Sequence, residues 1–328
     1  MNTTASILTL LLRNLPIFQS DINHRNHMPI KKNALILFCL LLALSYCKQP
    51  EAKQEVTEKK KEKDKTEKKQ SAAESYSSPP GYDLNKPVIF NLKSELDEIS
   101  GLVYYPKDTS VFAISDENGW LYKIHFTGKM QVEKWKFSKG QDFEDLVLLD
   151  STFYALESSG KIIAFKFVNT APSVSNTYGL QKGGKNEFEI LYLDSAAGKL
   201  VMICKDCEED PKAKVSAFSF DPSTTSFSTF YSLDANEIAE KLGLSKVKFK
   251  PSAACINPLT KELFIISSVN KALVITDNNG NIKSVYNLNP KIYKQPEGIT
   301  FTPAGDLLIS NEGADIGPAN VLIFKLKK

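Results

Sequence analysis

The chain has 328 residues, of which 42% are hydrophobic and 24% are charged, and its formal net charge at pH 7 is +3. This length allows one large domain or two of medium size. The small charge excess comes mostly from one low-complexity stretch, and basic residues do not gather on one predicted face. The composition therefore argues against a protein that binds nucleic acid.

A short apolar run near the N-terminus predicts a secretory signal. Residues 33–46 are almost entirely apolar, follow two lysines and precede Cys47. A transmembrane helix needs roughly 20 apolar residues, so this run is too short to be one. The segment at 44–47 resembles the lipobox of bacterial lipoproteins, which implies that Cys47 is lipidated and becomes the mature N-terminus. We expect residues 1–46 to form the signal region, with translation beginning either at Met28 or, with a longer leader, at Met1.

The next segment, residues 47–82, is predicted to be a disordered tether. It is rich in Lys, Glu, Ser and Pro and contains almost nothing that could be buried. Such a stretch cannot offset the entropy lost when a chain becomes ordered. A solvated spacer fits better than a basic arm for anionic lipid, because acidic residues are interspersed with the lysines.

A repeated phrase organises the remainder, residues 83–328. Each copy has an apolar strand, a tight turn and a second strand, which is the chemistry of a β-hairpin. The residue before each first strand recurs at intervals of 44, 45, 63 and 45 residues, at Ser100, Glu144, Glu189, Ser252 and Glu297. A period of about 45 residues with about four strands is expected of a β-propeller blade.

Five blades are predicted, and six is the alternative. The long interval contains residues 234–244, whose apolar spacing and leading Asp234 predict a short helix rather than a sixth blade. The last repeat has only three strands before the chain stops. The lone strand at residues 86–92 matches the endings of the other blades, so we expect it to complete the last blade and close the ring.

The cysteines give few signals. Cys204 and Cys207 have the CxxC spacing, but no second pair exists, so a zinc site is not predicted. We expect Cys204 and Cys255 to be core residues of strands. A disulfide from Cys207 is a lesser alternative that an oxidising compartment would permit.

Several motifs resemble the SdiA-regulated family of exported bacterial propellers. They are EISGL from Glu98, QDFEDL from Gln141, NEFEIL from Asn186 and QPEGI from Gln295, together with ISDE from Ile114 and ISNE from Ile309. The sequence departs from the family pattern at Asp145 and Ile190, where Gly is preferred, and at Ala253. The resemblance implies an exported propeller with a divalent cation, and it implies no established reaction.

Two rings of polar residues are expected to line the central channel, because the first strand of each blade is innermost in a propeller. The first ring is the set of repeat-register residues, Ser100, Glu144, Glu189, Ser252 and Glu297. The second lies at the ends of the second strands and comprises Asp116, Glu157, Lys205, Ser268 and Asn311, with Glu117 and Glu312 beside it.

Three glutamates in one narrow channel would repel each other unless they were protonated, paired with lysine or bound to a metal. Carboxylate and hydroxyl oxygens suit calcium or magnesium, so we predict a Ca²⁺ site at Glu144, Glu189 and Glu297. Lys205 could instead neutralise one of them. A further alternative is that the glutamates accept backbone hydrogen bonds from neighbouring blades and only hold the ring together.

The sequence predicts a membrane-anchored module of the bacterial cell envelope that binds a small molecule or a protein, with the lipid at Cys47 as its contact with the membrane. We expect a monomer with no nucleic-acid partner. The alternative is a metal-dependent phosphoester or ester hydrolase, by analogy with phytase-like propellers. A purely structural envelope role is a third hypothesis.

Overall fold

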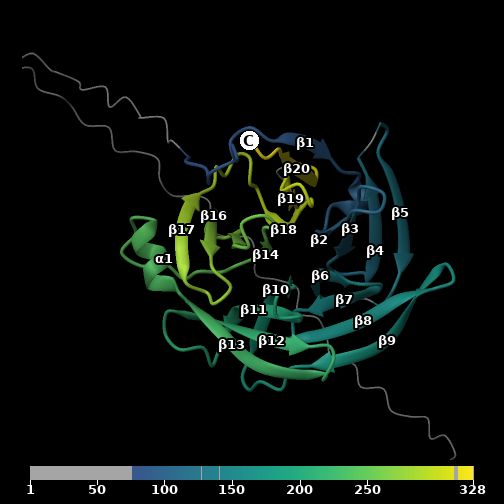
Figure 1. Ribbon diagram of the computed structural model, residues 1–328, viewed down its shortest axis with the longest axis horizontal. Helices are drawn as coiled ribbons and strands as arrows, with labels where there is room; N and C mark the ends of the chain where they lie inside the picture. Colours follow the sequence, from purple (N-terminus) through teal and green to yellow (C-terminus); the bar gives the residue numbers. More distant parts are fainter. Residues whose placement is uncertain (1–75, 127, 140, 314–316, 328) are drawn as a thin grey trace, which may run out of the picture. The chain divides into compact units, whose positions relative to one another are not determined.

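The computed structural model describes residues 76–126, 128–139, 141–313 and 317–327. These residues form five four-stranded antiparallel sheets arranged around a centre, which is a five-bladed β-propeller (Figure 1). Within this part of the chain no helix has the length and apolar character needed to span a membrane. The signal region, Cys47 and most of the tether lie outside the described residues.

Four blades are built from consecutive strands. In each, the first strand lies nearest the centre and the fourth lies at the outside (Figure 1). Blade 1 holds β2 (Ile99–Tyr105), β3 (Ser110–Ser115), β4 (Trp120–His125) and β5 (Gln131–Lys136). Blade 2 holds β6 (Phe143–Leu149), β7 (Thr152–Glu157), β8 (Lys161–Val168) and β9 (Ala171–Gly179). Blade 3 holds β10 (Asn186–Asp194), β11 (Lys199–Cys207), β12 (Lys214–Asp221) and β13 (Ser226–Asp234). Blade 4 holds β14 (Ala253–Ile256), β15 (Leu263–Ser267), β16 (Ala272–Thr276) and β17 (Ile282–Asn287).

The fifth blade joins the two ends of the described chain, as the sequence predicts. It holds β18 (Pro296–Phe301), β19 (Leu307–Asn311), β20 (Asn320–Phe324) and the N-terminal strand β1 (Val88–Asn91). β1 pairs antiparallel with β20 over its whole length. This pairing covers the edge that β20 would otherwise expose to solvent.

The described residues include 76–82, the last part of the segment predicted from the sequence to be the tether. The Tyr82 side chain is 7% exposed, and its hydroxyl donates to the Gly305 carbonyl at 2.6 Å. Leu84 is also buried. A short 3-10 helix, η1 (Ser94–Leu96), then connects β1 to β2.

The long interval between blades 3 and 4 contains a helix, α1 (Ala235–Lys241), and no strand among the described residues. The prediction of five blades is therefore confirmed and the six-blade alternative is wrong. Asp234 caps the helix by accepting a hydrogen bond from the Asn236 N–H at 2.8 Å. Ile238 and Ala239 are buried in the same apolar cluster as Phe249.

The hydrophobic core lies between neighbouring blades. Where blades 1 and 2 meet, Phe137 and Phe153 stack on Phe165 with ring centroids 4.5 Å and 5.2 Å apart. Strand β15 is buried along its whole length because blades cover both of its faces. The sheets therefore hold the inner strands firmly around the centre.

Candidate functional site

β-Bulges in the inner strands position the three glutamates of the first predicted ring. The pairing of the first two strands shifts register within Ser100–Leu102, Phe143–Asp145, Phe188–Ile190 and Pro296–Gly298. Glu144, Glu189 and Glu297 are the extra residues of three of these bulges. A β-bulge leaves its extra residue out of the ladder and turns its side chain, so all three carboxyls can face the channel rather than a neighbouring blade.

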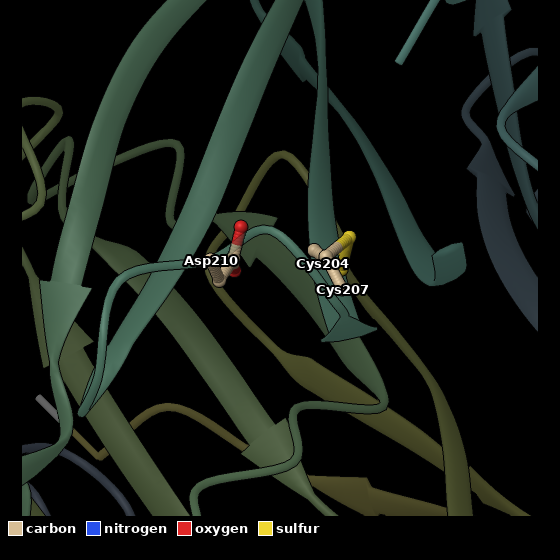
Figure 2. A group of neighbouring side chains, drawn as sticks. All are labelled: Cys204, Cys207 and Asp210. Carbon is tan, nitrogen blue, oxygen red and sulfur yellow. A yellow bond between two sulfur atoms is a disulfide. The ribbon is translucent and has the colours of Figure 1, made fainter. Parts of the chain in front are cut away.

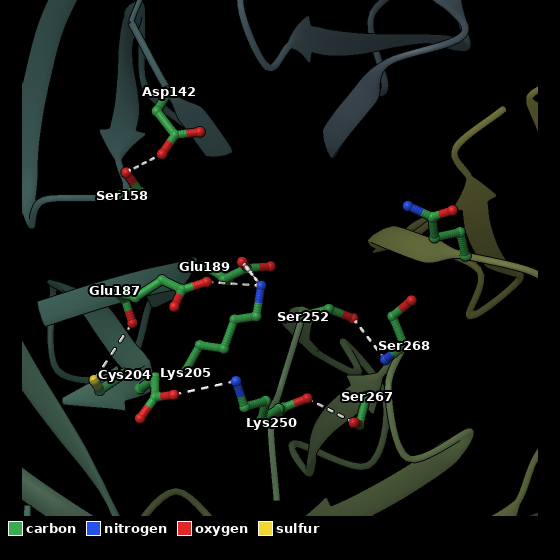
Figure 3. A network of polar contacts seen from close by, with 12 residues as sticks. Asp142, Ser158, Glu187, Glu189, Cys204, Lys205, Lys250, Ser252, Ser267 and Ser268 are labelled. Atoms are coloured by element: carbon green, nitrogen blue, oxygen red, sulfur yellow. Dashed lines mark hydrogen bonds and ion pairs between the residues drawn. The ribbon is translucent and has the colours of Figure 1, made fainter. Parts of the chain in front are cut away.

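A single lysine reaches into this acidic region. Lys205 is itself an extra residue, on β11 opposite Glu187 and Phe188. Its ammonium group contacts Glu189 and lies 3.0 Å from a Glu187 carboxylate oxygen (Figure 3). Burial alone would lower the pKa of Lys205, but its hydrogen bonds and charge interactions with the two glutamates raise that pKa above the ordinary value. Lys205 therefore stays charged and neutralises part of the ring, which is the lysine alternative considered above.

Glu144 and Glu297 form no ion pair with a described residue, although the charge of Lys205 lowers both pKa values and the Ser268 side chain hydrogen-bonds to Glu297. Burial raises the pKa of Glu144 to about 9, and the charges of Glu189, Asp142 and Asp116 add to the effect. Burial raises the pKa of Glu297 to about 8, with further contributions from Glu189 and Glu312. Both carboxyls therefore hold a proton at neutral pH, because the charged form is poorly solvated and surrounded by like charges.

Two aspartates lie beside Glu144 and share a hydrogen bond. Burial raises the pKa of Asp116 to about 7, and the charge of Asp142 and the hydrogen bond to it also raise it. The Asp142 carboxylate accepts in addition from the Ser158 hydroxyl (Figure 3). Asp116 belongs to the predicted second ring. Asp142 was not predicted, although it stands two residues before Glu144 in the QDFED motif.

Glu312 also belongs to the acidic region. Burial raises its pKa, and Glu98 and Glu189 add to the rise. Its carboxylate accepts a hydrogen bond from the Gln295 side-chain amide. We use the name "acidic channel end" for Asp116, Asp142, Glu144, Glu189, Glu297 and Glu312 with Lys205.

Two of the remaining predicted ring residues interact with the acidic region, because the Ser268 side chain hydrogen-bonds to Glu297 and the charge of Glu117 raises the pKa of Asp116. The others make structural contacts. Ser100 is buried in β2. The Ser252 hydroxyl donates to the Pro296 carbonyl at 2.7 Å and so joins blade 4 to blade 5. Glu157 accepts from Lys161 at 2.9 Å, within its own blade. The Asn311 amide donates to the Ile292 carbonyl and to Asn320, both at 3.0 Å.

The carboxylate that braces two blades is Asp145, one residue after the ring. Its two oxygens accept from the Leu146 N–H at 2.8 Å and from the Leu191 N–H at 2.9 Å, so it links blade 2 to blade 3. A Cβ atom at Gly101 would lie 2.7 Å from the Asp145 carboxylate, which explains the glycine at that position. The sequence marked Asp145 only as a departure from the family pattern.

Replacing Asp145 by alanine is expected to lower the free energy of unfolding by about 3 kcal/mol, because two buried N–H groups lose their acceptor. Urea unfolding followed by circular dichroism would measure the change. Asp145→Asn keeps one acceptor oxygen and should cost less. Equal stability of the wild type and the alanine variant would contradict this bracing role.

The CxxC pair forms a disulfide, which corrects the expectation that Cys204 is only a core residue. Cys204 is buried as expected, but its sulfur is bonded to that of Cys207 across a Cα–Cα distance of 6.0 Å (Figure 2). The bond spans Lys205 and Asp206, so it constrains the bulge that directs Lys205. Cys255 is the free cysteine of the described chain, and burial raises the pKa of its thiol to about 12.

The predicted calcium ligands do not converge on one point in this structure. Among the described residues, the one set of three or more His, Cys, Asp or Glu ligand atoms within 4.8 Å of one another is Cys204, Cys207 and Asp210. Its two sulfurs are bonded to each other and are not available as thiolates (Figure 2). Glu144, Glu189 and Glu297 do not fit direct coordination of one ion as they lie, and a calcium site there stays a prediction.

Comparison with known proteins identifies a family but no activity. No curated protein sequence matches the chain. Solved structures with a similar fold include a glutaminyl cyclase from Myxococcus xanthus, at 13% identity and TM-score 0.47, covering 74% of this chain and 100% of that one. A luciferin-regenerating enzyme has 12% identity and TM-score 0.44, with 73% and 95% of the two chains covered. Virginiamycin B lyase from Staphylococcus aureus has 14% identity and TM-score 0.39, with 74% and 75% covered. These likenesses carry no conclusion about function.

The family model named SdiA-regulated matches residues 81–315, which is most of the chain and nearly all of the propeller. This protein therefore belongs to the SdiA-regulated family.

Proposed function

We propose that this protein is an exported, lipid-anchored binding module of the bacterial cell envelope, whose propeller binds a positively charged ligand at the acidic channel end. The observation that carries the proposal is that the acidic channel end contains six carboxyl groups and a single lysine. Lys205 is paired with Glu189 and Glu187, while Asp116, Glu144 and Glu297 have pKa values of about 7, 9 and 8.

A cation is the ligand class that relieves this imbalance. Burial raises the pKa of each of these carboxyls, neighbouring carboxylates add to the rise, and the charge of Lys205 offsets it only in part at Glu144 and Glu297. A bound cation would supply further positive charge and displace the protons, so binding should strengthen as pH rises. Blades 2 and 3 are braced by Asp145, whose two oxygens accept backbone hydrogen bonds from Leu146 and Leu191.

Two kinds of cation share this chemistry. A calcium ion would require carboxyl oxygens to close around it at about 2.3–2.6 Å, which the present positions do not allow without movement. An amine or ammonium group on an organic ligand needs no such convergence, since it can hydrogen-bond to carboxylates on different blades. The experiment below separates the two.

Export and anchoring rest on the predicted signal and on Cys47, which lie outside the described residues. The Cys204–Cys207 disulfide supports export, because structural disulfides persist in oxidising compartments and are rare in the cytosol. Incorporation of labelled palmitate in wild-type cells, and its loss in Cys47→Ala, would test the anchor. Soluble, unlabelled wild-type protein would refute it.

Thermal unfolding of the purified protein at pH 8 tests cation binding. Calcium chloride, magnesium chloride and spermidine are added separately, with chelator as the reference. A ligand in hundredfold excess over its Kd should raise stability by roughly 2.7 kcal/mol. A shift with calcium alone would indicate a metal site, and a shift with spermidine alone would indicate an amine site.

The variant Glu144→Gln should lose the shift, whereas the exposed Glu240→Gln on α1 should keep it. Glu240 makes a suitable control because it undergoes the same substitution at an exposed position of α1, outside the acidic channel end. No shift with any cation, or an equal shift in both variants, would overturn the proposal.

The hydrolase alternative retains one supporting observation. Asp116, with a pKa of about 7 and a hydrogen bond to Asp142, has the proton affinity of a general acid or base at neutral pH. Calcium-dependent turnover of p-nitrophenyl phosphate or p-nitrophenyl acetate that disappears in Asp116→Asn would favour it. Equal rates in the wild type and in Asp116→Asn would rule out the hydrolase alternative.

A further inference from the structure

A concave site lies on blade 3, and it shares only Lys205 with the acidic channel end. It is a cavity of about 720 Å³ between the turn that joins β11 to β12, the start of α1 and the segment that follows α1. Ligand pockets commonly have volumes of about 300–1,000 Å³, so this cavity could hold a small organic molecule. We call it the lysine groove; its lining includes Lys212, Lys246, Lys248, Val215, Val247 and Phe249.

Positive charge dominates the lining of the lysine groove. Five lysines line it, at positions 205, 212, 214, 246 and 248, against two acids, Asp206 and Asp210. Some of these charges are already balanced. Lys214 lies 2.9 Å from Asp234, and Lys248 lies 2.8 Å from Asp206.

Asp206 is shared between two lysines, because the Lys250 ammonium also lies 3.1 Å from it. Lys212 and Lys246 make no ion pair with any described residue, and both side chains are exposed. The rim of the groove therefore offers ammonium groups that have no anionic partner within this part of the chain.

The floor of the groove is apolar. Phe249, Val215, Ala235 and Cys207 line it and are all less than 9% exposed. An inorganic anion would use only the rim, whereas a molecule with an apolar body and an anionic group would use both parts. The groove has the opposite charge to the acidic channel end, so the two sites should select different ligands.

We infer that the lysine groove binds an organic anion, with its carboxylate or phosphate group held by Lys212 and Lys246 and its apolar part on the floor around Val215 and Phe249. Hydrogen bonds from ammonium groups to anions are among the stronger polar contacts in proteins. The inference does not depend on the proposed function. Lys205 belongs to both sites and is left unchanged in the test.

Fluorescence titration with 8-anilinonaphthalene-1-sulfonate, an apolar anion, tests the inference on the whole protein. The wild type should bind the dye, and the double variant Lys212→Gln/Lys246→Gln should bind it at least about tenfold more weakly, since two charged contacts are lost. The matched control, Lys166→Gln/Lys291→Gln, removes two exposed lysines away from the groove and should bind as the wild type does. All four substitutions are at exposed positions, and an unchanged melting temperature would show that folding is intact.

Displacement of the dye identifies the anion. Octanoate and phenyl phosphate should both displace the dye, and the stronger of the two shows whether the groove prefers a carboxylate or a phosphate. Inorganic phosphate should displace the dye far less. Equal displacement by inorganic phosphate would contradict the role of the apolar floor. No dye binding by the wild type, or equal weakening in the groove and control variants, would overturn the inference.

Discussion

Replacing Lys205 by methionine is expected to lower the free energy of unfolding at pH 8 by about 2 kcal/mol. Breaking a buried ion pair costs about 3–5 kcal/mol, and the cost is reduced here because the lysine side chain is 22% exposed. The change leaves the Glu189 carboxyl, which is 8% exposed, beside Glu187 with no cation. Urea unfolding of the two proteins at pH 8 and pH 5 would measure the effect.

The loss should be smaller at pH 5 than at pH 8. Burial already raises the pKa of Glu189, and removal of the ammonium raises it further, so the carboxyl can take up a proton and lose its charge. The double variant Lys205→Met/Glu189→Gln should recover part of the stability at pH 8. A loss that is equal at both pH values, with no recovery in the double variant, would show that Lys205 acts through packing and not through its charge.

The wild-type protein is expected to lose stability as pH rises from about 5 to 9. The pKa of Glu144 in the folded protein is about 9 against an ordinary 4.5, so the folded state binds more protons than the unfolded state between these values. Stability falls with pH wherever the folded state binds more protons. The raised pKa values of Glu297, about 8, and of Asp116, about 7, also lower stability as pH rises, each between its ordinary pKa and its raised pKa.

The variant Glu144→Gln cannot titrate at this position, so the folded and unfolded states differ by one bound proton fewer. At pH 8 it should unfold at a higher temperature than the wild type, by about 2–4 °C for each 1 kcal/mol regained. At pH 5 the two proteins should differ little. The control Glu240→Gln should follow the wild type at both values, and a wild type whose stability rises from pH 5 to pH 9 would contradict the prediction.

The fold could be predicted from the sequence because its signals are local and repeated. The spacing of Ser100, Glu144, Glu189 and Glu297 fixed the period, and the unmatched strand before the first repeat predicted the pairing of β1 with β20. The helix α1 followed from a cap residue and its apolar spacing. These features depend on neighbours along the chain, which a single sequence displays.

The roles of individual carboxylates could not be predicted in the same way. Asp145 braces blade 3 because the Leu191 N–H, far along the sequence, meets its oxygen. Asp142 joins the acidic channel end through Asp116, which lies on another blade. The directions of the Glu144, Glu189 and Glu297 side chains depend on bulges in the inner strands, and a bulge is not visible from alternation of apolar residues. The Cys204–Cys207 disulfide is predicted only as a lesser alternative, because CxxC spacing is shared by disulfides, metal sites and free thiols.

The most direct test is the titration of the channel carboxyls themselves by carbon-13 NMR of protein labelled at Glu and Asp side-chain carboxyls. Signals would be assigned with the variants Glu144→Gln, Glu297→Gln and Asp116→Asn. We expect the midpoints to fall near 9, 8 and 7 respectively, which would show that no cation fully compensates these acids and that Glu144 and Glu297 hold protons at neutral pH while Asp116 is about half protonated. Midpoints below 5 for all three would mean that the carboxylates are already compensated, and the acidic channel end would not be a cation-binding site.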